Sequence, residues 1–255
     1  MNYIEIITTH WEILISFFAI ATLYASVGFG GGSSYLAILA LTSLAFTEIR
    51  ATALICNIVV VSNSTLLYYK NGFYNIKKVI PLVLASIPLA FLGGYLRIEE
   101  RMFFLLLGST LLAAAILMLY RKTSITSEKI KQSSFLKSFS FGGSIGFISG
   151  LVGIGGGIFL APLLHLSRWD TSKRIAATAS FFIFVNSIAG IFGQITNPEF
   201  SIDPTLTGIL AITVFIGGQI GTRIGIRLIN TENLKKATAI LVLYVAIKII
   251  IKYLT

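Results

Sequence analysis

Charged residues and cysteine are scarce in this sequence. Only 12% of its 255 residues are charged, about half the share found in ordinary soluble domains, whereas 55% are hydrophobic. The single cysteine, Cys56, lies inside an apolar run, which excludes a disulfide framework. At about 20 apolar residues per crossing, the chain has room for about eight to ten transmembrane helices. The composition therefore predicts an all-α, polytopic membrane protein.

The sequence also lacks the signatures of soluble enzymes. Neither glycine run is followed by the Lys-Ser or Lys-Thr of a nucleotide-binding loop, and no His and Cys residues are spaced as metal ligands. No Ser, His and Asp set has the context of a hydrolase. No Asp or Glu falls at the centre of an apolar run, which argues against the usual carboxylate proton relay. We therefore predict no enzymatic activity, no cofactor and no metal site.

The excess of positive charge has a pattern typical of membrane loops. Twenty Lys and Arg residues against ten Asp and Glu give a net charge of +10. These cations sit in short clusters between apolar runs, as in cytoplasmic loops, and not along one helical face as in nucleic-acid-binding proteins. The pattern predicts a multi-pass protein of the cell inner (plasma) membrane, surrounded by membrane lipid and without a nucleic acid partner.

Ten apolar runs bounded by charges, glycine and proline predict about ten transmembrane segments, five in each half. In the first half they cover residues 11–27, 33–46, 51–69, 79–96 and 102–120. In the second half they cover residues 139–152, 157–166, 175–195, 205–228 and 234–254. The expected organisation is a first transmembrane repeat at 1–122, a cytoplasmic linker at 123–138 and a second repeat at 139–255. The second and seventh runs are short, which leaves open whether they span fully.

Three short motifs occur in both halves in the same order and at the same spacing, which indicates an internal duplication. They are VGFGGG at 27–32 and VGIGGG at 152–157, Ala-Thr-Ala at 51–53 and 177–179, and Gly-Gly at 93–94 and 217–218.

The charges of equivalent loops predict that the two halves lie in the bilayer in opposite orientations. The loop after the third run carries Lys70, Lys77 and Lys78, whereas its counterpart in the second half carries Glu199 and Asp203. The loop after the fourth run is balanced in the first half and basic in the second. Since basic loops stay in the cytoplasm, the two halves form inverted repeats with an odd number of crossings each. Re-entrant short runs would leave four crossings per half and equal loop signs, contrary to the charges.

The glycine motifs predict broken helices. Three consecutive glycines at membrane depth cost a helix about 0.8–1 kcal/mol each relative to alanine. We expect the chain to unwind at 30–32 and at 155–157 and to restart with its free N–H groups and positive dipole end facing a cavity. Two such ends, arriving from opposite sides, would bind a small anion without a buried Lys or Arg. The alternative is close helix packing. The candidate binding residues of these motifs are Gly30, Gly31, Gly32, Ser33, Ser34, Gly155, Gly156 and Gly157.

Uncharged polar residues within the apolar runs form a second group of candidates. Side chains of this kind either join helices or line a wet pathway. For a single Ser or Thr the interhelical hydrogen bond is favoured, whereas for the two asparagines the readings are balanced. The candidate binding residues of this group are Thr52, Asn57, Thr178 and Asn186.

The glycine motifs, the Ala-Thr-Ala positions and the Gly-Gly pairs resemble the sulfite exporter TauE/SafE family over nearly the whole chain. The second half is the more similar, with GLVGIGGGIFLAPLL at 150–164, whereas Ala37 stands where the second half has Pro162. The resemblance implies a secondary transporter of small sulfur-containing anions such as sulfite or organosulfonates, often an exporter. It carries over the glycine motifs and the regions of Thr52 and Thr178, while the two asparagines are added for their polarity.

We therefore predict an exporter of a small sulfur-containing anion that works by alternating access, with the anion bound at the interface of the repeats. One alternative is an anion channel with the same lining residues. The other is a non-transporting membrane component in which the glycines serve packing alone. The expected partner is the small anionic substrate (sulfite, a sulfonate or a related anion), and a homodimer is compatible with the sequence.

Overall fold

The structure is a computed structural model that describes residues 11–42, 44–96, 98–119, 134–198, 200–227 and 232–254. Within these ranges all regular structure is helical, as predicted. The helices are α2 (Trp11–Ser26), α3 (Gly32–Leu39), α4 (Phe46–Lys70), α5 (Ile76–Tyr95), α6 (Glu100–Leu119), α7 (Phe135–Val152), α8 (Gly157–Leu166), α9 (Ser172–Ile195), α10 (Pro204–Arg227) and α11 (Glu232–Leu254).

The helix bounds follow the predicted apolar runs closely, with three main differences. α4 begins at Phe46, five residues before the predicted run at 51–69. α3 ends at Leu39, whereas the predicted run continues to 46, so that run combines a short helix with the loop after it. α7 begins at Phe135, inside the predicted linker and four residues before the predicted run at 139–152. Residues 123–133 of the linker lie outside the described residues.

Seven of the described helices are long and apolar enough to cross a membrane. α5 is an example, because exposed apolar side chains spaced three and four residues apart form one face of this helix. They are Ile80, Leu84, Ile87 and Phe91. Such a face is suited to lipid. α3 has 8 residues and α8 has 10, or about 12 and 15 Å at 1.5 Å per residue, so neither can cross a core of about 30 Å alone. The count of ten crossings stays a prediction.

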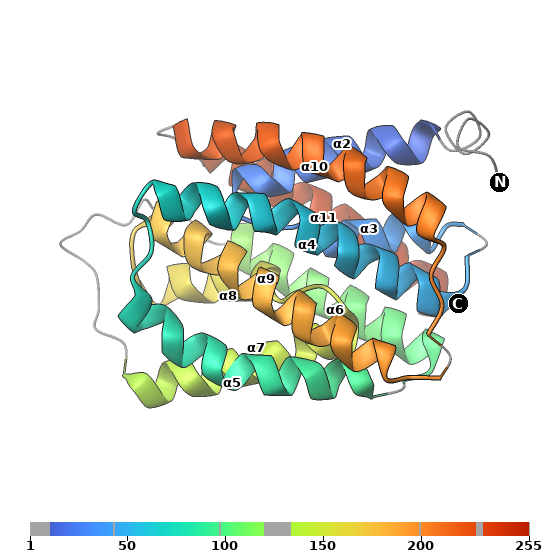
Figure 1. The fold of residues 1–255 in the computed structure, drawn as a ribbon, viewed down its shortest axis with the longest axis horizontal. Coiled ribbons are helices and arrows are strands. Elements are labelled where there is room, and N and C mark those ends of the chain that lie inside the picture. The colour runs from blue at the N-terminus through green and yellow to red at the C-terminus, as the bar shows by residue number, and fades with distance from the viewer. Residues whose placement is uncertain are drawn as a thin grey trace.

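Contacts between helix termini gather at two ends of the molecule. At end A, Lys252 of α11 donates to the carbonyl oxygen of Ala40 after α3, the start of α6 contacts the end of α11, and the loop after α9 contacts the first turn of α4. At end B, Lys78 of α5 contacts Asp170 after α8, and the first turn of α9 contacts the end of α10. End A lies on the right of Figure 1 and end B on the left.

Equivalent helices of the two halves run in opposite directions between these ends. α4 and α6 begin at end A, whereas their counterparts α9 and α11 begin at end B. α5 begins at end B, whereas its counterpart α10 begins at end A. α3 ends at end A and α8 at end B. This is the relation that the loop charges predict. The orientation of the two halves in a bilayer stays a prediction.

The first two helices of each half turn back together. α2 runs beside α10 from end A toward end B, and α3 returns to end A, while α7 and α8 do the same from end B (Figure 1). Three end-to-end helices follow in each half. How many helices of each half cross a bilayer, and whether the short runs are re-entrant, stays a prediction.

Glycine-lined contacts hold each half against the other. In Figure 1, α2 lies beside α10 at the top, α5 beside α7 at the bottom, and α4 with α9 between them. Glycines four residues apart share one helix face, and they let the backbones approach so closely that an added Cβ would overlap the neighbouring helix. They are Gly217, Gly221 and Gly225 of α10, which face α2, and Gly142, Gly146 and Gly150 of α7, which face α5.

The opposite directions of the two halves predict the outcome of cysteine labelling. Because the sole native cysteine, Cys56, is buried, single Asn75→Cys and Ser201→Cys variants report on the loops before α5 and before α10. A membrane-impermeant thiol reagent is expected to label position 75 from the cytoplasmic side and position 201 from the opposite side. Labelling of both positions from one side would contradict the inverted arrangement.

Gly225→Ala is expected to destabilise the protein, because the added methyl group would overlap the carbonyl group of Ser26 on α2. Overpacking of this kind costs about 1–3 kcal/mol. Gly208→Ala on the same helix is the matched control, since nothing lies within 4 Å of a Cβ there. Thermal unfolding of the purified protein should give a lower midpoint for Gly225→Ala and an unchanged or higher one for Gly208→Ala. Equal midpoints would remove the packing role from Gly225.

Candidate functional site

Each half contains a helix break at its glycine motif. Residues 27–31 separate α2 from α3, and residues 153–156 separate α7 from α8. Gly31 and Gly156, which precede the two restarts, have φ angles of 92° and 79°. Residues with a side chain rarely adopt this left-handed conformation, whereas glycine does so readily. The predicted broken helices are confirmed, and glycine is needed at these two positions for the backbone path as well as for packing.

The two breaks meet at one side chain, the fully buried amide of Asn57 on α4. Its Oδ1 atom accepts a hydrogen bond of 3.2 Å from the N–H group of Gly32, the first residue of α3. Its Nδ2 atom donates to the carbonyl oxygen of Ile154 in the second break at 3.2 Å, and to the hydroxyl of Ser187 on α9 at 3.1 Å. Asn57 therefore joins both breaks and both central helices.

The glycines make room for this amide. A Cβ atom at Gly30 would overlap Oδ1 of Asn57, and one at Gly155 would lie 2.6 Å from its Nδ2 atom and from the hydroxyl of Ser187. The sequence predicts free N–H groups at both restarts, but the N–H group of Gly32 is instead bonded to Asn57. The amide thus takes one of the backbone donors that the prediction assigns to an anion.

The second break has no equivalent amide. Ile183 of α9 lies against Gly157 as Asn57 lies against Gly32, so the polar side chain of the first half corresponds to an apolar one in the second. Asn186, the other predicted asparagine, donates to the carbonyl oxygen one turn earlier in its own helix, and its Oδ1 atom has no hydrogen-bond partner. The duplicated halves therefore form an asymmetric site.

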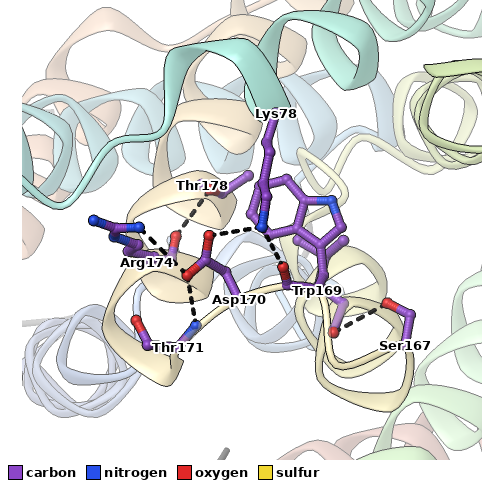
Figure 2. A network of polar contacts seen from close by, with 8 residues as sticks. Lys78, Ser167, Trp169, Asp170, Thr171, Arg174 and Thr178 are labelled. Carbon is purple, nitrogen blue, oxygen red and sulfur yellow. Dashed lines mark hydrogen bonds and ion pairs between the residues drawn. The ribbon is translucent and has the colours of Figure 1, made fainter. Parts of the chain in front are cut away.

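The other predicted residues make separate contacts, and Figure 2 draws Thr178 in the network at end B. The hydroxyl of Ser34 is 2.8 Å from a tyrosine hydroxyl of α2, and Ser33 is buried beside it. Thr52 bonds to Thr207 on α10 at 2.9 Å, the interhelical pairing favoured for a single threonine. The hydroxyl of Thr178 donates to a carbonyl oxygen of its own helix. The structure brings the glycine motifs together with Asn57, and the binding roles of these hydroxyls stay predictions.

Figure 2 shows a polar network at end B that the sequence analysis missed. Lys78 donates to the carboxylate of Asp170 at 3.1 Å and to the carbonyl oxygen of Trp169 at 2.7 Å, and its ammonium group lies 5.1 Å from the centroid of that indole ring. Asp170 is 1% exposed, accepts the N–H of Thr171 and lies 3.7 Å from the guanidinium of Arg174. The network ties α5 of the first half to the loop after α8. A lone acid within the basic stretch 168–174 was its signal in the sequence.

A cavity of about 270 Å³ lies between α5, α7 and α8, next to this network. Most of its lining is apolar, and Lys137 contributes its only charge. The cavity reaches Ile145, which lies beside Gly156 of the second break. Open space therefore extends from end B toward the breaks.

Comparisons with known proteins give one family and several relatives. The family model described as "Sulfite exporter TauE/SafE" matches residues 13–249. A protein of Sinorhizobium fredii named "Probable membrane transporter protein y4hK" is 32% identical over 241 residues, which make up 93% of this chain and 97% of that protein. A protein of Haemophilus influenzae named "Probable membrane transporter protein" is 32% identical over 83 residues, or 32% of this chain and 30% of that protein. No solved structure matches the chain.

Asn57→Ala is expected to destabilise the protein by about 2–6 kcal/mol, because it leaves the buried N–H of Gly32 and the carbonyl of Ile154 unpaired at about 1–3 kcal/mol each. Ser64→Ala is the matched control on the same helix, since it removes a single hydroxyl pair, with Thr222. Thermal unfolding in detergent should show the larger loss for Asn57→Ala. Similar losses for the two variants would mean that the breaks do not depend on this amide.

Proposed function

The chain belongs to the sulfite exporter TauE/SafE family, and from this we propose that it is a membrane transporter that exports a small sulfur-containing anion such as sulfite or an organosulfonate. The observation that carries the proposal is the meeting of two helix breaks at Asn57. Broken helices at the interface of repeats are the usual position of a transporter's binding site, and helix N-termini favour negative charge. The site would take the anion between the restarts of α3 and α8.

Alternating access would follow from the way the helices pack. α2, α3, α4 and α10 form one bundle and α5, α7, α8 and α9 another, and the bundles touch along α4 and α9. Rocking about this contact would open the breaks to one end and then to the other. The network of Lys78 and Asp170 lies within the second bundle, since α5 and the loop between α8 and α9 both belong to it, so this ion pair would stay intact while the bundle moves as one unit.

The distribution of charge supports an inward-facing end B. Lys78, Lys173 and Arg227 lie at end B, whereas Glu48 and Asp203 lie at end A. Because cationic loops remain on the cytoplasmic side, end B would face the cytoplasm of a cell whose plasma membrane holds the protein. Inverted repeats with an odd number of crossings each would then place both binding motifs at similar depth from opposite sides.

Outward movement of an anion needs no coupling ion. In the described helices the acidic residues lie in first turns, which supports the absence of a carboxylate relay at the membrane centre. With the cytoplasm negative, each negative charge that leaves gains about 2.3 kcal/mol per 100 mV. We therefore propose electrogenic efflux driven by the membrane potential.

Proteoliposomes with an imposed K⁺-diffusion potential, and without a pH or Na⁺ gradient, test this proposal. A monoanion, either a sulfonate or hydrogen sulfite, should accumulate on the positive side about fiftyfold per 100 mV at equilibrium, and reversing the potential should reverse the flux. Liposomes with the Asn57→Ala variant serve as the matched control. Flux that does not depend on the sign of the potential, or that requires a proton or Na⁺ gradient, would contradict efflux driven by the potential and would indicate coupled transport. Single-channel current without saturation or trans-stimulation would indicate that the protein is a channel and not a carrier.

A further inference from the structure

Arg50 of α4 is a buried cation without an acidic partner in the part of the chain that the structure describes. It is 6% exposed, and one terminal nitrogen donates to the carbonyl oxygen of Leu151 at 3.2 Å. Its guanidinium carbon lies 5.5 and 5.3 Å from the ring centroids of Phe46 and Phe103. Its Nε atom has no hydrogen-bond partner. A charge removed from water in this way is costly unless an opposite charge and its hydrogen bonds compensate it.

Gln194 of α9 presents a second unpaired donor to the same place. It is 6% exposed, and its Nε2 atom has no hydrogen-bond partner. A Cβ atom built at Gly153, at the start of the second break, would lie 3.7 Å from this Nε2 atom and 3.9 Å from Nε of Arg50. Two buried donors from different helices therefore converge on one point beside the backbone of the break.

The space at Gly153 is not a general property of the repeated motif. Its equivalent in the first half is Gly28, where a Cβ atom would overlap the backbone of Ala176. Ala176 is the residue of α9 that corresponds to Arg50 of α4 in the duplication. One copy of the glycine is thus packed against backbone, whereas at the other copy the donors of Arg50 and Gln194 lie at ordinary contact distance.

Arg50 and Gln194 form the outer of two polar levels around the second break. Arg50 and Asn57 are seven residues apart on α4, and Ser187 and Gln194 are seven residues apart on α9, so each pair shares one helix face about 10 Å apart along the axis. At the inner level, Asn57 and Ser187 bond to each other. At the level nearer end A, the two donors remain unpaired.

We propose that Arg50 and Gln194 bind the oxyanion group of the transported molecule on the end A side of the breaks, an inference that rests on the proposed function. Guanidinium and amide N–H groups donate to sulfonate or sulfite oxygens, and charge-assisted hydrogen bonds of this kind are the strong ones. A single positive charge in a low-dielectric setting balances a single negative charge. The site therefore selects monoanions over dianions and over neutral molecules of the same shape.

The test measures binding to the purified full-length protein by isothermal titration calorimetry. The probes are methanesulfonate, its neutral analogue methanesulfonamide, sulfate as a dianion, and sulfite. The variants are Arg50→Gln, Arg50→Lys and Gln194→Leu. Arg101→Gln at end A and Gln219→Leu on α10 are matched controls that lie away from the space. Thermal unfolding without ligand reports on folding.

The wild type is expected to prefer methanesulfonate to both methanesulfonamide and sulfate. Arg50→Gln should weaken methanesulfonate binding at least about thirtyfold and erase its preference over methanesulfonamide, since a buried charge loses its partner. Gln194→Leu should weaken it about tenfold. Arg50→Lys should retain the preference at lower affinity, and both controls should bind like the wild type. An arginine that only holds the carbonyl of Leu151 would lower stability and leave the preference intact.

Different results would overturn the inference and the proposed function. Binding of methanesulfonate and sulfite with wild-type affinity by Arg50→Gln and Gln194→Leu overturns the site while leaving anion transport in place. Tighter binding of sulfate overturns the single-charge balance. If Arg50→Gln does not fold, two measurements still test the site. They are binding by Gln194→Leu and the wild-type affinities for methanesulfonate, methanesulfonamide and sulfate. A wild type that neither binds nor transports sulfite or methanesulfonate overturns the proposed function, and the site with it.

Discussion

The structure depends on one constraint, that every backbone polar group at membrane depth needs a partner inside the protein. Two helix breaks expose such groups, and Asn57 satisfies groups of both with a single amide. An amide is suited to this because it accepts on one atom and donates on the other. The glycines on each side give it access from two directions. The breaks are therefore mutually dependent, although they belong to different halves of the chain.

The two copies of the motif differ in how closely their first glycine is packed. In the first copy, Gly28 and Gly30 are closely packed, against Ala176 and Asn57. In the second copy, Gly153 lies beside two unpaired donors, Nε2 of Gln194 and Nε of Arg50. A duplicated sequence has thus kept one backbone path and diverged in the side chains that face it, which is how one site can offer a different chemistry toward each end of the molecule.

Much of the fold could be predicted from the sequence, because hydropathy and glycine runs act locally. The helix bounds and the breaks at Gly31 and Gly156 follow from such signals. The side chains that meet in the site could not be predicted in this way, since Arg50 stands one residue before an apolar run and therefore suggests a loop cation. It is buried because α4 begins earlier, at Phe46. Polarity alone selected Asn57 and Asn186 equally, and only their hydrogen-bond partners in the structure distinguish them.

The crossed packing of the halves has a consequence for biosynthesis. α2 finds the glycine face it needs only on α10, about 200 residues later in the chain. At a synthesis rate of about 5–20 residues per second, this separation corresponds to roughly 10–40 s. During that interval the α10-facing surface of the nascent α2 is uncovered, and Asn57 lacks Ile154 until the 97 residues between them have been made. The first half therefore cannot complete its packing until the second half has been synthesised, and the two breaks assemble late in biosynthesis.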